Sequence, residues 1–119
     1  MIDFTDLRVW QKARTLCIEA YKVGDALPPK ERFRLTDQLC RAAVSVVNNI
    51  AEGFGRGGGK DFAYHLRIAR GSTNETRCCG MIACDLKYLH PSTIAPLDGL
   101  AVECGKMLTT LLKRVGGLT

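Results

Sequence analysis

Apolar residues recur every three or four positions along four stretches of this sequence, and proline or glycine separates each stretch from the next. This spacing matches the 3.6-residue period of a helix that buries one face. No stretch alternates apolar and polar residues with the β-branched enrichment that strands need. The sequence therefore predicts an all-α protein with Leu39, Val46, Leu66 and Leu108 in its core.

The helix breakers set the expected boundaries. Pro28 and Pro29 end the first stretch, five of the seven residues 53–59 are glycine, and Pro91 follows the third stretch. Short connections between amphipathic helices favour an antiparallel up-down-up-down four-helix bundle, and 119 residues allow one core, so we expect a single domain over residues 1–119. The predicted helices span about residues 5–26, 31–54, 60–89 and 93–115.

Composition narrows the class of protein. With 46% hydrophobic and 24% charged residues the chain has a globular composition, and its net charge of +5 favours acidic partners. The acidic first residues do not form a secretory signal, and no apolar run reaches the roughly 20 residues of a membrane span. We therefore expect a cytoplasmic protein with no membrane partner. Its cysteines are expected to be reduced packing residues, at positions 17, 40, 78, 79, 84 and 104.

Two glycine motifs suggest nucleotide binding but lack the required context. Residues 53–58 satisfy G-x-G-x-x-G, yet they follow a predicted helix, whereas a dinucleotide-binding turn follows a strand. Gly59-Lys60 is followed by Asp61, where a phosphate-binding loop has Ser or Thr for magnesium. We expect no cofactor.

The cysteines and histidines do not form a recognisable reactive site either. No C-x-x-C pair occurs, and the spacing among Cys78, Cys79, Cys84 and His90 does not match common zinc sites. No nucleophile, base and orienting group can be assembled from the spacing. We expect no metal site, no catalytic residue and no enzymatic activity.

The first predicted helix carries two apolar lines. One lies along Leu7, Trp10 and Ala13, and a second runs at seven-residue steps through Val9, Leu16 and Val23. This apolar arc is wider than a single seam requires. We expect contact with another subunit to cover part of it, so Val9, Leu16 and Val23 are candidate oligomer-interface residues.

A basic line follows one side of the third predicted helix. Cations along it suit successive phosphates, and a tyrosine among them suits an unpaired base. Charged outer faces are also ordinary features of amphipathic helices, so a plain solvated face is the alternative. The candidate nucleic-acid-binding residues are Arg56, Lys60, Tyr64, Arg67, Arg70, Asn74 and Arg77.

Glu75 is a carboxylate within an otherwise largely apolar line of the third helix. If the second and third helices are neighbours, Arg41 can reach Glu75 and neutralise it. A lone Glu without a partnered acid or nucleophile makes a poor active site. We therefore predict a structural polar network of Arg41 and Glu75.

Three segments together carry a distinctive pattern. They are Phe4, Leu7, Val9, Trp10 and Ala13; Leu35, Thr36, Gln38, Leu39, Arg41, Ala42, Ala43, Ser45, Val46, Asn49, Ile50, Ala51, Glu52 and Gly53; and Leu66, Ile68, Ala69, Gly71, Ser72 and Glu75. These segments resemble the four-helix bundle proteins encoded in intervening sequences of bacterial 23S ribosomal RNA genes. The resemblance is most specific from Arg41 to Gly53, while the fourth helix matches only in character. Arg34 departs from a usual glycine, and Gly57 to Gly59 replace a Ser-containing helix start.

The resemblance implies an up-down bundle that forms a homopentamer with a basic surface and has no enzymatic activity. A related group of accessory proteins in diversity-generating retroelements works with a reverse transcriptase and nucleic acid. Our leading hypothesis is a homo-oligomeric adaptor that binds RNA or a ribonucleoprotein through the face from Arg56 to Arg77. The alternative is a protein-binding scaffold, acting through the apolar surface of the first and fourth helices, with no nucleic-acid role.

Overall fold

The computed structural model describes residues 2–116, and the described chain is built from four long helices and two single-turn 3-10 helices. No strand occurs within these residues. The all-α expectation is confirmed. The helices are α1 (Arg8–Ala26), α2 (Leu35–Gly55), α3 (Gly59–Asp85) and α4 (Pro91–Arg114), with 3-10 turns η1 (Phe4–Asp6) and η2 (Pro29–Glu31).

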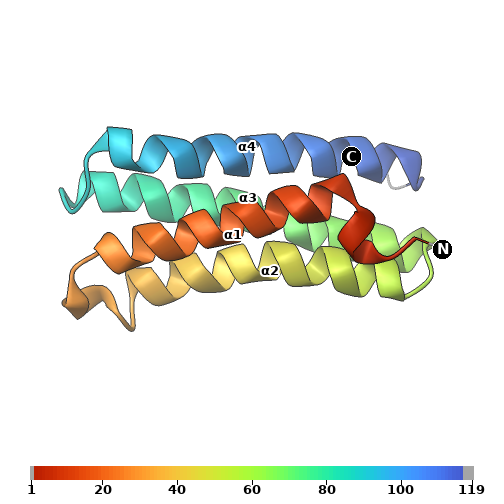
Figure 1. Ribbon diagram of the computed structural model, residues 1–119, viewed down its shortest axis with the longest axis horizontal. Helices are drawn as coiled ribbons and strands as arrows, with labels where there is room; N and C mark the ends of the chain where they lie inside the picture. Colours follow the sequence, from red (N-terminus) through yellow and green to blue (C-terminus); the bar gives the residue numbers. More distant parts are fainter. Residues whose placement is uncertain (1, 117–119) are drawn as a thin grey trace.

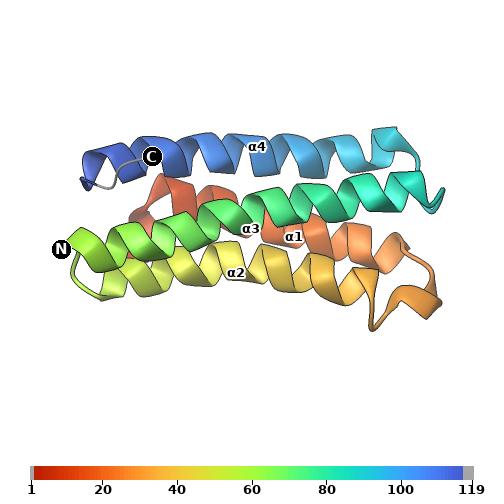
Figure 2. The same ribbon diagram turned by 180° about the vertical axis from the view of Figure 1, so that it is seen from behind.

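Each helix runs in the direction opposite to the one before it, as the colours in Figure 1 show. Helix α1 packs against α2 and α4, and α3 packs against the same two neighbours from the other side (Figure 2). The bundle measures 44 × 21 × 20 Å. The four helices thus surround one core that runs along the whole length of the molecule.

One large apolar side chain from each helix illustrates that core. Leu16 of α1, Leu39 of α2, Leu66 of α3 and Leu108 of α4 are each at most 1% exposed. Removing a side chain of this size from solvent contributes about 1.5–3 kcal/mol. The spacing of apolar residues identified Leu39, Leu66 and Leu108 correctly as core positions, whereas Leu16 was expected at a contact between subunits.

The predicted oligomer interface on α1 is wrong. Val9, Leu16 and Val23 are 5%, 0% and 2% exposed, and all three belong to the core of the monomer. Helix α1 contacts both α2 and α4, and a helix with two neighbours buries a wider arc than one with a single partner. The second apolar line is therefore explained inside one subunit.

Two helix starts differ from the prediction because local side-chain contacts decide them. Helix α2 begins at Leu35 and not at residue 31, since Pro29–Glu31 forms a 3-10 turn and the Glu31 carboxylate accepts a hydrogen bond from the Leu35 backbone N–H. Helix α4 begins at Pro91, two residues earlier than expected. The His90 side chain caps it by accepting a hydrogen bond from the Ser92 backbone N–H.

The ends of α3 are set by backbone conformation. The glycine-rich boundary predicted here is a tight turn, because only residues 56–58 separate α2 from α3. Gly57 and Gly58 in this turn and Gly59 at the start of α3 have positive φ, which a residue with a side chain rarely adopts. At the other end α3 stops at Asp85 and not at residue 89, because Lys87 takes a left-handed conformation with φ 65°.

None of the helices within residues 2–116 combines the length and the apolar character that crossing a lipid bilayer requires.

Candidate functional site

Six of the seven candidate nucleic-acid-binding residues lie on α3, while Arg56 directly follows α2, and the seven differ in exposure. Lys60, Tyr64, Arg67 and Asn74 are exposed, and Tyr64 is 56% exposed. The Tyr64 ring lies edge-on to His65, with the ring centroids 5.2 Å apart. The first three turns of α3 therefore present two cations and an aromatic ring to solvent.

Arg77 is held within the protein. Its Nε donates a hydrogen bond to Asp98 Oδ1 at 2.8 Å, and its Nη2 donates to Oδ2 at 3.4 Å. Asp98 lies on α4, so the pair links α3 to its neighbour. The hydrogen bond to the Asp98 carboxylate, with its negative charge, raises the pKa of the Arg77 guanidinium. This arginine serves mainly as a structural contact.

Two further candidate arginines have partial partners. Arg56 donates a 2.8 Å hydrogen bond to Glu52 Oε2, and this bond, together with the nearby His65, lowers the pKa of Glu52. Arg70 donates a 3.3 Å hydrogen bond to the Thr109 hydroxyl of α4. Arg56 remains exposed and Arg70 is half-buried. Both keep a positive charge at the edges of the candidate face.

A shallow groove of about 480 Å³ separates α3 from α4 beside this face. Arg70, Asn74 and Arg77 form its α3 wall, and Lys106 and Thr109 lie on its α4 wall. The structure thus brings three of the seven candidate residues together in one groove. Lys60, Tyr64 and Arg67 do not line it.

The predicted contact between Arg41 and Glu75 is wrong. Arg41 forms an ion pair with Asp37 Oδ2 at 2.9 Å, one turn away on its own helix. Glu75 is an exposed side chain and needs no buried partner. Asp37 lies four residues before Arg41 on the same helix, so the two side chains can pair whatever the orientation of α2 relative to α3.

A different polar network joins α2 to α3. His65 Nδ1 lies 2.9 Å from Asn49 Oδ1, and the Ser72 hydroxyl donates a 2.9 Å hydrogen bond to the Ser45 hydroxyl. The Asn49 amide donates to the Ser45 carbonyl at 2.9 Å, which fixes its orientation, so His65 Nδ1 carries the proton. The network satisfies polar groups that would otherwise be buried without partners.

Sequence reasoning did not assign this network. Ser45, Asn49 and Ser72 stand in the segments that carry the family resemblance, and the signal was the four-residue spacing of Ser45 and Asn49 beside an apolar seam. Gly53 belongs to the same surface, because a Cβ placed on it would lie 2.7 Å from the His65 Cβ. The small residue lets α2 and α3 approach closely at this end of their contact.

Buried thiols in the bundle are held protonated. Burial raises the pKa of Cys79 to about 11 and that of Cys104 to about 12. Thiols with such values are poor nucleophiles near neutral pH. Within residues 2–116, no three His, Cys, Asp or Glu side chains gather closely enough to hold a metal ion.

Most of the chain matches the model of one protein family. The family model for the 23S rRNA-intervening sequence protein matches residues 5–110. The chain belongs to this family. The match covers all four helices, although it ends within α4. No curated protein matches the chain.

A solved structure supports the fold assignment of this 23S rRNA-intervening sequence family member. The crystal structure of a protein with unknown function from the S23 ribosomal protein family, from Bacteroides thetaiotaomicron VPI-5482, superposes with a TM-score of 0.81. The two sequences are 22% identical, and the likeness covers 88% of this chain and 98% of the other. This likeness concerns the fold alone.

The geometry shows what the segment from Arg41 to Gly53, where the resemblance to the family is most specific, does in this family member. Its buried residues, including Val46 and Ile50, fill the core, and Ser45, Asn49 and Gly53 form the contact with α3. Most residues between Arg41 and Gly53 therefore pack α2 against the other helices. The outward-facing cations and apolar side chains remain available for partners.

Proposed function

We propose that this protein is a non-catalytic, homo-oligomeric helical bundle that binds RNA through the outer face of the first turns of α3. One observation carries the proposal. Lys60, Tyr64 and Arg67 are exposed at spacings of four and three residues, so they lie along one side of the helix. Within residues 2–116, neither Lys60 nor Arg67 forms an ion pair.

The chemistry of these three side chains fits single-stranded nucleic acid. The two cations lie about two helical turns apart and can contact phosphates of one strand, while Tyr64 between them stacks on an unpaired base. Base stacking on an aromatic side chain contributes about 1–3 kcal/mol. Arg56 and Arg70 extend the positive field at the two ends of the face.

Salt-dependent binding tests the proposal. A fluorescein-labelled single-stranded oligouridylate is titrated with the full chain at several salt concentrations, and anisotropy gives the affinity. Replacing Lys60 and Arg67 together by Glu removes two phosphate contacts, so the log-log salt slope should become less steep by about 1.4. Tyr64→Ala should weaken binding by roughly 10-fold without changing the slope.

A matched control reverses the same number of charges elsewhere. Lys22 lies in the C-terminal part of α1 and Arg32 directly follows η2, and both side chains are exposed. The C-terminal end of α1 and η2 lie at the end of the bundle opposite to the start of α3 (Figure 1). The double variant Lys22→Glu, Arg32→Glu should bind oligouridylate with an affinity within about 2-fold of the wild type, because the reversed charges lie far from the proposed RNA face. Equal loss in both double variants, or no binding by the wild type at low salt, would reject the proposed RNA face.

For self-association we propose a contact built on the exposed apolar side of α3. Ile68, Ile82 and Leu86 are 36%, 45% and 50% exposed, and Ile68 and Ile82 are two seven-residue steps apart. Large apolar side chains aligned on an outer helix face are typical of association surfaces. Replacing Ile82 and Leu86 by Asp should lower the mass measured by light scattering, while helicity stays unchanged.

The same apolar side supports the second candidate function, a protein-binding scaffold with no nucleic-acid role. This alternative no longer involves Val9, Leu16 and Val23, since those residues are buried. It expects that oligouridylate does not bind and that the Ile82→Asp, Leu86→Asp variant keeps its mass but loses a protein partner. Binding of oligouridylate that depends on Lys60 and Arg67 would exclude it.

A further inference from the structure

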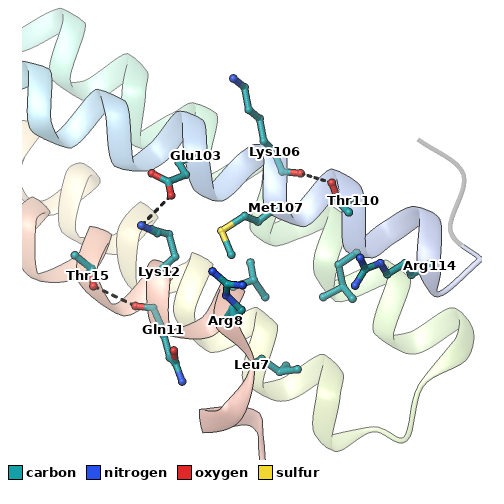
Figure 3. A pocket seen from close by; sticks show the side chains of 12 residues that line it. Leu7, Arg8, Gln11, Lys12, Thr15, Glu103, Lys106, Met107, Thr110 and Arg114 are labelled. Carbon is teal, nitrogen blue, oxygen red and sulfur yellow. Dashed lines mark hydrogen bonds and ion pairs between the residues drawn. The ribbon is translucent and has the colours of Figure 1, made fainter.

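A groove lies between α1 and α4, outside the proposed RNA face of Lys60, Tyr64 and Arg67. It has a volume of about 800 Å³ and follows the first two turns of α1 and the last three turns of α4, between Glu103 and Arg114 (Figure 3). No residue of α3 lines it. Its lining shares only Lys106 and Thr110 with the groove between α3 and α4, and it includes none of Lys60, Tyr64 and Arg67 of the proposed RNA face.

The groove has an apolar floor and a cationic rim. Met107 and Leu111 of α4 form half-buried parts of the floor, and Figure 3 shows the Met107 side chain pointing into the space between the helices. Four cations line the groove against one carboxylate. They are Arg8 and Lys12 of α1 and Lys106 and Arg114 of α4.

The one carboxylate in the groove is only weakly held. Glu103 Oε1 lies 2.9 Å from Lys12 Nζ, and the two side chains are 56% and 30% exposed. An ion pair this exposed contributes about 0–1 kcal/mol, so an incoming carboxylate can replace Glu103 at Lys12. Within residues 2–116, Arg8 and Lys106 form no ion pair. The groove thus offers unneutralised positive charge directly beside apolar surface.

We propose that the groove between α1 and α4 binds an acidic amphipathic helix of a partner protein. An amphipathic helix lays its apolar face into a groove through residues at three-to-four spacing, and flanking carboxylates complement a cationic rim. The α4 wall from Glu103 to Arg114 is roughly 16 Å long, which matches about three turns of a partner helix. The flexible thioether of Met107 adapts to the apolar side chains of different partners.

The apolar floor is what favours a peptide over nucleic acid as the occupant. A phosphate backbone needs cations and hydrogen-bond donors, and it gains nothing from contact with Met107 and Leu111. An acidic amphipathic helix uses both the rim and the floor. The prediction therefore requires that binding depend on charge and on apolar contact together.

Selection from a library of random 12-residue peptides tests this proposal with the full chain as bait. Enriched peptides should combine several Asp or Glu residues with apolar residues at three-to-four spacing. A synthetic peptide of the enriched consensus is then titrated by fluorescence anisotropy. The double variant Arg8→Glu, Lys106→Glu should weaken its binding by roughly 10-fold or more, and Met107→Ala by roughly 3-fold or more.

Controls separate a local effect from a general one. The charge-matched variant Lys22→Glu, Arg32→Glu should bind the peptide within about 2-fold of the wild type. Because charge reversal can disturb a helix, Arg8→Gln with Lys106→Gln provides a neutral second variant, which should weaken binding by a smaller factor. Arg8 and Lys106 are both exposed, so circular dichroism should report unchanged helicity.

Three outcomes would overturn the proposal. Enriched peptides without an excess of acidic residues, or a consensus peptide whose binding ignores Arg8→Glu, Lys106→Glu, would contradict an acidic ligand. Competitive displacement of the peptide by oligouridylate would assign the groove to RNA. A lower mass of Arg8→Glu, Lys106→Glu in light scattering would assign it to a second copy of the chain.

Discussion

The Tyr88 hydroxyl donates a 2.8 Å hydrogen bond to Glu31 Oε2, and so joins the connection between α1 and α2 to the connection between α3 and α4. Both connections lie at the same end of the bundle in Figure 1. The Lys30 ammonium lies 5.6 Å from the centre of the Tyr88 ring. Glu31 also accepts from Arg34 and from the Leu35 backbone, which makes this carboxylate the centre of a closed polar cluster.

Tyr88→Phe should lower stability in a way that depends on pH. The hydrogen bond from Tyr88, followed by that from the Leu35 N–H, lowers the pKa of Glu31 below its ordinary 4.5. The corresponding stability is full above pH 4.5 and is lost as pH falls through the lowered pKa. Urea denaturation should therefore give a lower free energy of unfolding for Tyr88→Phe than for the wild type at pH 7, and this difference should become smaller toward pH 3.

At high pH the hydrogen bond between Tyr88 and Glu31 is lost because the Tyr88 hydroxyl ionises. The hydrogen bond to Glu31 raises the pKa of Tyr88 above 10.0, so its contribution is full below pH 10 and is lost as pH rises through the raised value. The difference in tyrosine absorbance between the wild type and Tyr88→Phe measures this titration apart from those of Tyr21 and Tyr64. A Tyr88 that ionises at or below pH 10 would contradict the observed contact.

Gly53→Ala should destabilise the bundle by about 1–2 kcal/mol, although alanine is the better helix former. The new Cβ would lie 2.7 Å from the His65 Cβ and 3.1 Å from Phe62 Cδ1, so α2 and α3 must separate. Gly71→Ala on α3 is the matched control, because its Cβ meets nothing within 4 Å. It should stabilise the protein by about 0.5–1 kcal/mol, measured by thermal unfolding.

Asn49→Ala should cost about 1–3 kcal/mol of stability, since it leaves the buried His65 Nδ1 without its partner. Asn48→Ala changes the neighbouring exposed amide and should stay within about 0.5 kcal/mol. Chemical denaturation of the two variants provides the comparison. Equal effects would show that the hydrogen bond between Asn49 and His65 contributes nothing specific.

Arg77 and Arg67 should separate stability from RNA binding. Arg77→Ala removes an ion pair to Asp98 whose side chains are 34% and 33% exposed, so a double-mutant cycle should give a coupling of about 0.5 kcal/mol. Arg77→Ala should change the affinity for oligouridylate less than Arg67→Ala does. Arg67→Ala should leave the free energy of unfolding within about 0.5 kcal/mol of the wild type. The reverse pattern would refute the assigned roles.

The cysteines should react with iodoacetamide in a defined order. Cys78 is exposed and should be modified first. Burial raises the pKa of Cys79 to about 11, so at pH 8 only on the order of one thiol in a thousand is ionised. Cys104, with a pKa of about 12, should react more slowly still. Mass spectrometry of the modified protein between pH 7 and 9 measures all three rates.

The sequence alone determined the class of fold and the composition of its core. Apolar spacing placed Leu39, Val46, Leu66 and Leu108 inside, and all four are at most 1% exposed. Proline and glycine marked the connections, because these residues act on the backbone locally. The resemblance to the 23S rRNA-intervening sequence family was likewise carried by segments of sequence, and the match over residues 5–110 confirmed it.

Only the tertiary structure decided what each helix faces. Periodicity reports that Val9, Leu16 and Val23 share a side of a helix, but two neighbouring helices cover that side within the monomer. The rotation of α2 against α3 is set by packing over the whole interface, so Arg41 pairs with Asp37 while Asn49 meets His65. Local spacing cannot encode such rotations, because they depend on contacts between residues far apart in the chain.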